Sequence, residues 1–125
     1  MPSDLASKLQ LKSDQSLLVI NAPVEHAPEL DEISLTNAVP ASAVLVFVTQ
    51  LEKVPDLLQQ GIASIRPDGL FWVAYPKGGS GLPSDVNRDR LRLAAEPIGW
   101  QSVRLVAIDA IWSAMRFRPA DQIGK

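Results

Sequence analysis

The sequence of 125 residues contains no cysteine and a single histidine, His26, and both absences restrict the chemistry open to it. Without thiols, structural thiolate zinc sites, redox pairs and cysteine nucleophiles are excluded. One imidazole leaves a zinc site without a second histidine ligand, and no activated serine accompanies it for a catalytic relay. The sequence therefore predicts no metal site and no catalytic residues, and we expect His26 to be a solvent-facing loop residue.

The chain also lacks a long hydrophobic run and a basic excess. Its longest uncharged apolar stretch, residues 38–48, is interrupted by Pro40 and is shorter than the roughly 20 residues that a membrane helix needs. The N-terminus "MPSDLASKLQ" has no basic start followed by an apolar core, so we expect a cytoplasmic protein without membrane association. The net charge is −2. Because phosphate neutralisation supplies most of the affinity of nucleic-acid binders, this charge disfavours nucleic acid as a partner.

Short apolar runs rich in β-branched and aromatic residues are what the sequence does contain. The runs at 17–22, 43–49 and 70–75 are continuous, which is typical of strands covered on both faces. The runs at 101–108 and 112–119 are joined by a tight connection and predict a hairpin. We interpret residues 1–125 as a single α/β domain.

Helical patterns lie between these runs. Apolar residues three or four apart at 51–65 predict a helix with one buried stripe, which Pro55 forces to start late or to kink. The turn "RPDG" (66–69) follows it. A second helix is expected from Asp85 to about Ala95, capped by Ser84. Together these patterns predict a three-layer sandwich with a mostly parallel sheet of about five strands and a C-terminal antiparallel hairpin strand, a partial Rossmann-like fold.

Two resemblances accompany this pattern. A chain that ends in a parallel strand plus an antiparallel hairpin strand, with "IRPDGLFWVAY" as its central strand, resembles the later part of class I S-adenosylmethionine-dependent methyltransferases. The segments "LLVINAP", "RPDGLFWVAYPK", "SDVNRD" and "AIDAIWSAMRFRP" are similar to a family of small uncharacterised bacterial α/β proteins, a domain of unknown function. This second resemblance covers most of the chain from Leu17 onwards. It implies a fold and no catalytic residues.

The turn after the first strand departs from the methyltransferase pattern. That superfamily has a glycine-rich turn there, which lets the backbone approach the cofactor, whereas this chain continues into "NAPVEHAPEL" without a glycine. The sequence therefore disfavours S-adenosylmethionine, and we expect no cofactor.

The stretch "YPKGGSG" (75–81) is the strongest candidate for a ligand site. Parallel strands place it at the carboxyl edge of the sheet, where α/β folds bind ligands, and the following helix would direct its free amides towards it. Asp109 and Trp112 of the hairpin would lie at the same edge. The candidate ligand-binding residues are Tyr75, Lys77, Gly78, Gly79, Ser80, Gly81, Ser84, Asn87, Arg88, Asp109 and Trp112.

The glycines match no established nucleotide motif. Lys77 precedes them, unlike the lysine of a P-loop, and a third glycine of the dinucleotide pattern is missing after Gly81. A flexible connection between strand and helix is the favoured interpretation of this stretch, and anion binding is the alternative. Arg116 and Arg118 lie too far along the returning strand to join the site, so we expect them to pair with Asp89, Asp85 or a helix carbonyl.

These observations favour a non-catalytic binding or interaction module. Its partner would be another protein or a small anionic ligand at the Tyr75–Asn87 edge. A degenerate S-adenosylmethionine-dependent methyltransferase, or another nucleotide-dependent transferase, is the alternative. The sequence leaves homo-oligomerisation open.

Overall fold

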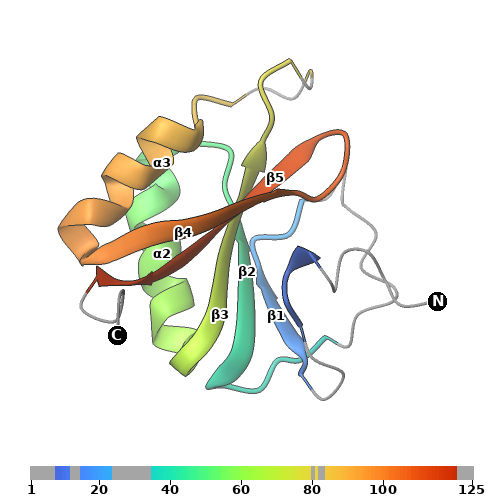
Figure 1. Ribbon diagram of the computed structural model, residues 1–125, viewed down its shortest axis with the longest axis vertical. Coiled ribbons are helices and arrows are strands. Elements are labelled where there is room, and N and C mark those ends of the chain that lie inside the picture. Colours follow the sequence, from blue (N-terminus) through green and yellow to red (C-terminus); the bar gives the residue numbers. More distant parts are fainter. Residues whose placement is uncertain (1–7, 12–14, 24–34, 80, 82–83, 121–125) are drawn as a thin grey trace.

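A computed structural model of the protein describes residues 8–11, 15–23, 35–79, 81 and 84–120. The described residues form one five-stranded sheet with the strand order β1-β2-β3-β5-β4 (Figure 1). The strands are β1 (Leu17–Ile20), β2 (Ala41–Phe47), β3 (Ile65–Pro76), β4 (Trp100–Ala107) and β5 (Trp112–Pro119). The helices are α2 (Val54–Ser64) and α3 (Arg88–Ala95), with short 3-10 turns η1 (Leu51–Lys53) and η2 (Glu96–Ile98).

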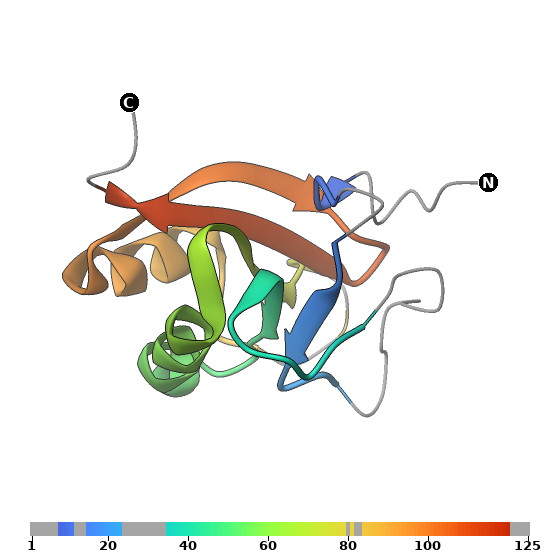
Figure 2. The same cartoon turned by 90° about the horizontal axis from the view of Figure 1, so that it is seen from below.

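The sheet is mixed, so the expected fold class was wrong. β1 pairs with β2 and β2 with β3 in parallel, whereas β5 is antiparallel to both of its neighbours, β3 and β4. β4 therefore runs in the same direction as β3 but lies at the edge, because β5 inserts between them. Both described helices lie on one face of the sheet (Figure 2), which corrects the expected three-layer sandwich.

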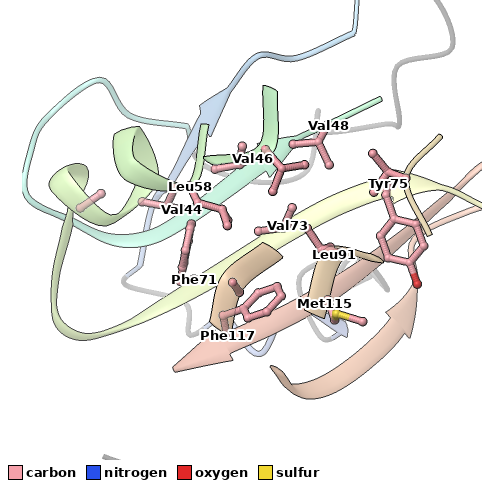
Figure 3. Packing of buried hydrophobic residues seen from close by; sticks show 14 residues of the cluster. Val44, Val46, Val48, Leu58, Phe71, Val73, Tyr75, Leu91, Met115 and Phe117 are labelled. Atoms are coloured by element: carbon pink, nitrogen blue, oxygen red, sulfur yellow. The ribbon is translucent and has the colours of Figure 1, made fainter. Parts of the chain in front are cut away.

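The helix-covered face holds the larger hydrophobic cluster (Figure 3). Val54 and Leu58 of α2 and Leu91 of α3 pack there on alternate residues of the central strands. Alternation along a strand explains the selection, since every second side chain points to the same face. The strand residues labelled in Figure 3 are Val44, Val46, Phe71, Val73, Tyr75, Met115 and Phe117.

The opposite face of the central strands is also buried, but against an N-terminal segment. Leu9 is fully buried in this second cluster with Leu45, Trp72 and Trp112. The indole Nε1 of Trp72 donates a hydrogen bond of 3.0 Å to the carbonyl oxygen of Leu9. Coverage on both faces is why the runs of β2 and β3 are continuously apolar.

Both ends of α2 differ from the expected helix. Pro55 lies in the first turn of α2, where its missing N–H is no loss, so the helix starts late, at Val54. After the helix, β3 already begins at Ile65, and the expected turn 66–69 lies within this strand. The register jumps there: Ala41 faces Ile65, but Ala43 faces Leu70. The "RPDG" signal therefore marks an irregularity in a strand rather than its start.

Close packing of α2 on the sheet requires a glycine. A Cβ at Gly61 would lie 2.5 Å from a ring carbon of Phe71, so no larger residue fits without a shift.

No helix of the described residues is long and apolar enough to cross a membrane.

Candidate functional site

The carboxyl end of β3 and the β4–β5 turn form one rim of the sheet. The Lys77 backbone N–H donates to the carbonyl oxygen of Ile111 at 2.7 Å, so residues 77 and 109 lie at the same end. The Asp109 carboxylate accepts hydrogen bonds of 2.8 Å from the N–H groups of Ile111 and Trp112. Asp109 therefore builds the turn that supports the rim.

An open pocket of about 330 Å³ lies at this rim, between the end of β3, the start of α3 and the hairpin. Its lining includes five of the residues that the sequence singled out: Tyr75, Lys77, Gly78, Asn87 and Arg88. The others are Pro76, Asp89, Leu105 and Ser113, which the sequence analysis missed. Leu105 and Ser113 enter from the hairpin, and their place follows from the strand register, in which Tyr75 faces Ser113. Only the order β3-β5-β4 could have revealed them.

Tyr75 forms the buried end of the pocket. It is only 6% exposed, and burial raises the pKa of its phenol above the usual value of 10.0. The nearby Arg88 charge and a hydrogen bond with the Ser113 side chain oppose this rise in pKa. The phenol is thus protonated at neutral pH and can donate a hydrogen bond.

Two cations and one carboxylate surround the mouth of the pocket. Arg88 Nε lies 3.7 Å from the Asp89 carboxylate, which also lies 3.6 Å from a guanidinium nitrogen of Arg92. These ion pairs are exposed and therefore weak. Lys77 forms no ion pair with a described residue. The charge balance of the mouth is positive, which suits an anionic group.

The start of α3 differs from the expectation. The helix begins at Arg88 rather than Asp85, because Asn87 is the cap: its side-chain oxygen accepts from the Arg90 N–H at 2.9 Å. The Ser84 hydroxyl instead accepts from the Val86 N–H at 3.0 Å. The Ser84 cap was therefore wrong, and asparagine, an equally good capping residue three positions later, made the better boundary.

Several candidate residues lie away from the pocket. Trp112 is fully buried and packs edge-on against Phe47, with 5.0 Å between ring centroids, so it belongs to the core rather than to a ligand site. Gly79 and Gly81 have φ values of 81° and 86° and nothing near them, which fits a connecting turn. Ser80 and His26 lie outside the described residues.

Asp85 has a role that the sequence did not indicate. Its carboxylate accepts the Leu51 N–H at 2.7 Å and so attaches the segment before α3 to the start of η1. Asp85 also lines a second open pocket, of about 390 Å³, with Thr49, Gln50, Glu52 and Ser84. This pocket lies beyond the carboxyl end of β2. Its residues are far apart in the sequence and carry no shared motif.

Asn21 makes the turn after β1 that the absence of glycine seemed to forbid. Its φ is 60°, in the left-handed region that asparagine tolerates better than most residues. Its side-chain nitrogen donates to the carbonyl oxygen of Phe47 at 2.8 Å, joining the ends of β1 and β2. The segment "INAP" (20–23) carries this signal, because asparagine tolerates positive φ.

The arginines of β5 do not pair with the helix. A guanidinium nitrogen of Arg116 donates to the Gln10 side chain at 2.8 Å, whereas Asp89 bonds with Arg88 and Arg92. Arg116 shares its face with Ala114, which lies in the cluster opposite the helices. The expected pairing with Asp89, Asp85 or a helix carbonyl was therefore wrong, because the side chain points to the other face.

The chain matches no protein-family profile and no curated protein. Solved structures with a similar fold do match it. A solved structure described as "The structure of LepI complex with SAM" is similar to it, with a TM-score of 0.51 and 12% identity over 92% of this chain and 39% of that chain. At this identity the likeness shows a similar fold and nothing more. The chain spans well under half of the matched one.

The same match corrects the expectation about cofactors. The missing glycine after the first strand predicts no cofactor and disfavours S-adenosylmethionine. A protein of similar fold was solved in complex with SAM, and Asn21 supplies the left-handed turn that glycine would supply. The expectation of no cofactor was therefore wrong. Among the residues that the structure describes, no group of three or more His, Asp or Glu side chains could hold a metal ion.

Proposed function

We propose that this chain is a binding domain with a methyltransferase-like fold, and that its ligand is a small anion bound in the pocket at Tyr75. The observation that carries the proposal is the composition of that pocket. A buried phenol that donates a hydrogen bond lies behind Lys77 and Arg88, at the carboxyl edge of the sheet. Folds with parallel strands bind ligands at this edge.

Binding rather than catalysis suits the groups that line the pocket. The raised pKa of Tyr75 makes its phenol a poor base at neutral pH, since it loses its proton only above pH 10. Ser113 forms a hydrogen bond with this phenol, which is not a base that could activate a nucleophile. A carboxylate or phosphate group could accept from the phenol and lie between the two cations.

Titration calorimetry with inorganic phosphate, citrate and AMP would test the proposal. We expect at least one of these anions to bind and to raise the melting temperature, because a ligand that binds only the folded state stabilises it. Lys77→Ala should weaken binding by about tenfold, the loss of one charge-assisted contact. Lys53→Ala, which removes a lysine charge from an exposed position of η1 outside the pocket, is the control and should leave the affinity unchanged. If none of the anions binds, or both variants behave alike, the proposal fails.

S-adenosylmethionine binding is a second candidate, favoured by the likeness to a SAM complex and by the left-handed Asn21 turn between β1 and β2. In this case the cofactor would occupy the ends of β1 and β2 rather than the Tyr75 pocket. Titration with S-adenosylmethionine and S-adenosylhomocysteine separates the candidates. Binding that survives Lys77→Ala but is lost in Asn21→Val, whose branched side chain does not suit positive φ, would favour this second candidate.

A further inference from the structure

Three arginines gather on the face of the β4–β5 hairpin that is turned away from both helices. Arg104 of β4 lies directly opposite Arg116 of β5 in the strand register. Arg118 follows Arg116 by two residues, so strand alternation places it on the same face. Like charges directly opposite each other on a sheet are destabilising. A bound anion between Arg104 and Arg116 would therefore reduce the repulsion between their charges.

No described carboxylate compensates these charges. The ion pairs of the described residues all involve Asp89, on the helix side of the sheet. Arg116 bonds only with the neutral amide of Gln10, and its Nε is buried without a hydrogen-bond partner among the described residues. Burial and the charges of Arg118 and Arg104 lower the pKa of Arg116. A carboxylate next to the three arginines would offset the repulsion between their positive charges.

The arginines lie beside a free strand edge. β4 is the last strand in the sheet order, so its outer edge pairs with no strand among the residues that the structure describes. Val103 and Leu105 of β4 are 41% and 46% exposed, although both are apolar. In Figure 2 α2 and α3 both lie below the hairpin, and the short turn at residues 8–11 lies on its other side, where Gln10 bonds with Arg116. An extended peptide could therefore hydrogen bond along β4 and cover these two side chains.

Charge and register select the occupant. Nucleic acid would meet a chain of net charge −2, which is unfavourable for a polyanion along most of its surface. A second copy that pairs through β4 in antiparallel register would bring its own Arg104 close to this one, which is repulsive. An acidic extended peptide has neither problem, because alternate carboxylates would face the arginines while the other side chains cover the apolar positions.

We propose that the outer edge of β4, together with Arg104, Arg116 and Arg118, is a docking surface for an acidic, extended segment of a partner protein, which adds to the sheet as a sixth strand. The three arginines are on the opposite face from Lys77 and Arg88, whereas Leu105 of the same strand edge also lines the Tyr75 pocket. Substitution of an arginine therefore tests this proposal separately from anion binding in that pocket.

Fluorescence anisotropy with a labelled eight-residue peptide of alternating glutamate and valine tests this surface. We expect saturable binding at low ionic strength that weakens with added salt. Arg104→Glu should reduce the affinity about tenfold or more, since it replaces attraction with repulsion at the edge. Arg92→Glu makes the same charge change on an exposed position of α3 and is the matched control. A peptide of alternating lysine and valine should not bind.

Two N-methylated peptides test strand addition itself. One carries N-methyl groups on all glutamates and the other on all valines, so each blocks the N–H groups on one edge of the peptide. A strand that pairs with β4 uses only one of its edges, and we expect one of these peptides to bind and the other to fail. Equal binding of both, or loss with both, would overturn strand addition.

The remaining outcomes also decide the matter. No binding of the acidic peptide, or equal loss of affinity in Arg92→Glu, would overturn the proposal. Tighter binding of a single-stranded oligonucleotide than of the peptide would assign the surface to nucleic acid instead. A dimer in light scattering that Val103→Lys abolishes would assign it to a second copy. Circular dichroism of each variant confirms that the fold is retained.

Discussion

The half of the sheet made of β1, β2 and β3 differs from the β4–β5 hairpin in how its faces are covered. β2 is buried along nearly its whole length, on one face by α2 and on the other in a cluster that includes Leu9 of the N-terminal segment. β4, by contrast, has no buried residue, and five of its eight positions are exposed.

This difference separates stability from recognition within one sheet. Burial of apolar side chains provides most of the stabilisation of a fold, and here it is concentrated in the parallel half. In the hairpin, β5 also contributes buried residues to both faces, whereas β4 supplies exposed side chains, a free edge and an uncompensated arginine. We therefore expect substitutions in the parallel half to change the free energy of unfolding, and substitutions on β4 to change binding.

The largest effect should come from Trp72→Ala on β3. Trp72 is fully buried, and its indole donates to Leu9, so the substitution removes both a large apolar group and the contact that holds the N-terminal segment. We expect a loss of about 3–5 kcal/mol in the free energy of unfolding, measured by urea denaturation followed by circular dichroism. Val103→Ala on exposed β4 should cost under about 0.5 kcal/mol. Similar losses for the two variants would remove the contrast between the regions.

The same contrast explains how far the sequence predicted the fold. Continuous apolar runs located β1, β2 and β3, because burial on both faces leaves no polar position in the run. They did not indicate what covers each face: helices were expected on both, but Leu9 and its neighbours cover one of them. Nor does local patterning specify which strand lies beside which, so the insertion of β5 between β3 and β4 and the mixed sheet were missed.

The candidate site was predicted where it depends on neighbouring residues in the chain. Lys77 and Arg88 lie on either side of one connection, and both line the pocket. Ser113 comes from a strand whose pairing the sequence did not specify, and it was missed. The backbone of Trp112 lies at the rim, beside Pro76. Its side chain points into the core, and this direction depends on packing that the sequence does not show.

Asp109→Ala should have a smaller effect, confined to the hairpin. Its carboxylate accepts two backbone N–H groups in the β4–β5 turn, which would lose their partner. We expect a loss of about 1–2 kcal/mol in the free energy of unfolding and faster hydrogen exchange at Lys77, whose N–H bonds with the same turn.

Asp109→Asn is the matched control for this turn. It keeps an oxygen acceptor and should recover most of the stability, because the bonds require an acceptor more than a charge. Exchange at Val46, in the parallel half, should be unaffected by local opening of the hairpin. If asparagine were as harmful as alanine, the charge of Asp109 rather than its hydrogen bonds would support the rim.

The smallest expected effect is on the pKa of Tyr75, a β3 residue that pairs with Ser113 of the hairpin. It is the only tyrosine in the chain, so phenolate absorbance during a pH titration reports this residue alone. We expect its pKa above 10.0, because burial disfavours the charged phenolate. Arg88→Gln should raise the pKa further, since the Arg88 charge favours the phenolate.

The raised pKa of Tyr75 also predicts the sign of a stability change. The folded protein holds the phenol proton more tightly than the unfolded chain, so the free energy of unfolding falls as pH rises through about 10 and beyond, and is unaffected below. The difference in stability between the parent protein and Tyr75→Phe isolates this contribution, because other groups titrate alike in both. A pKa at or below 10.0 would mean that burial of Tyr75 does not outweigh the Arg88 charge and the Ser113 hydrogen bond, which both lower its pKa.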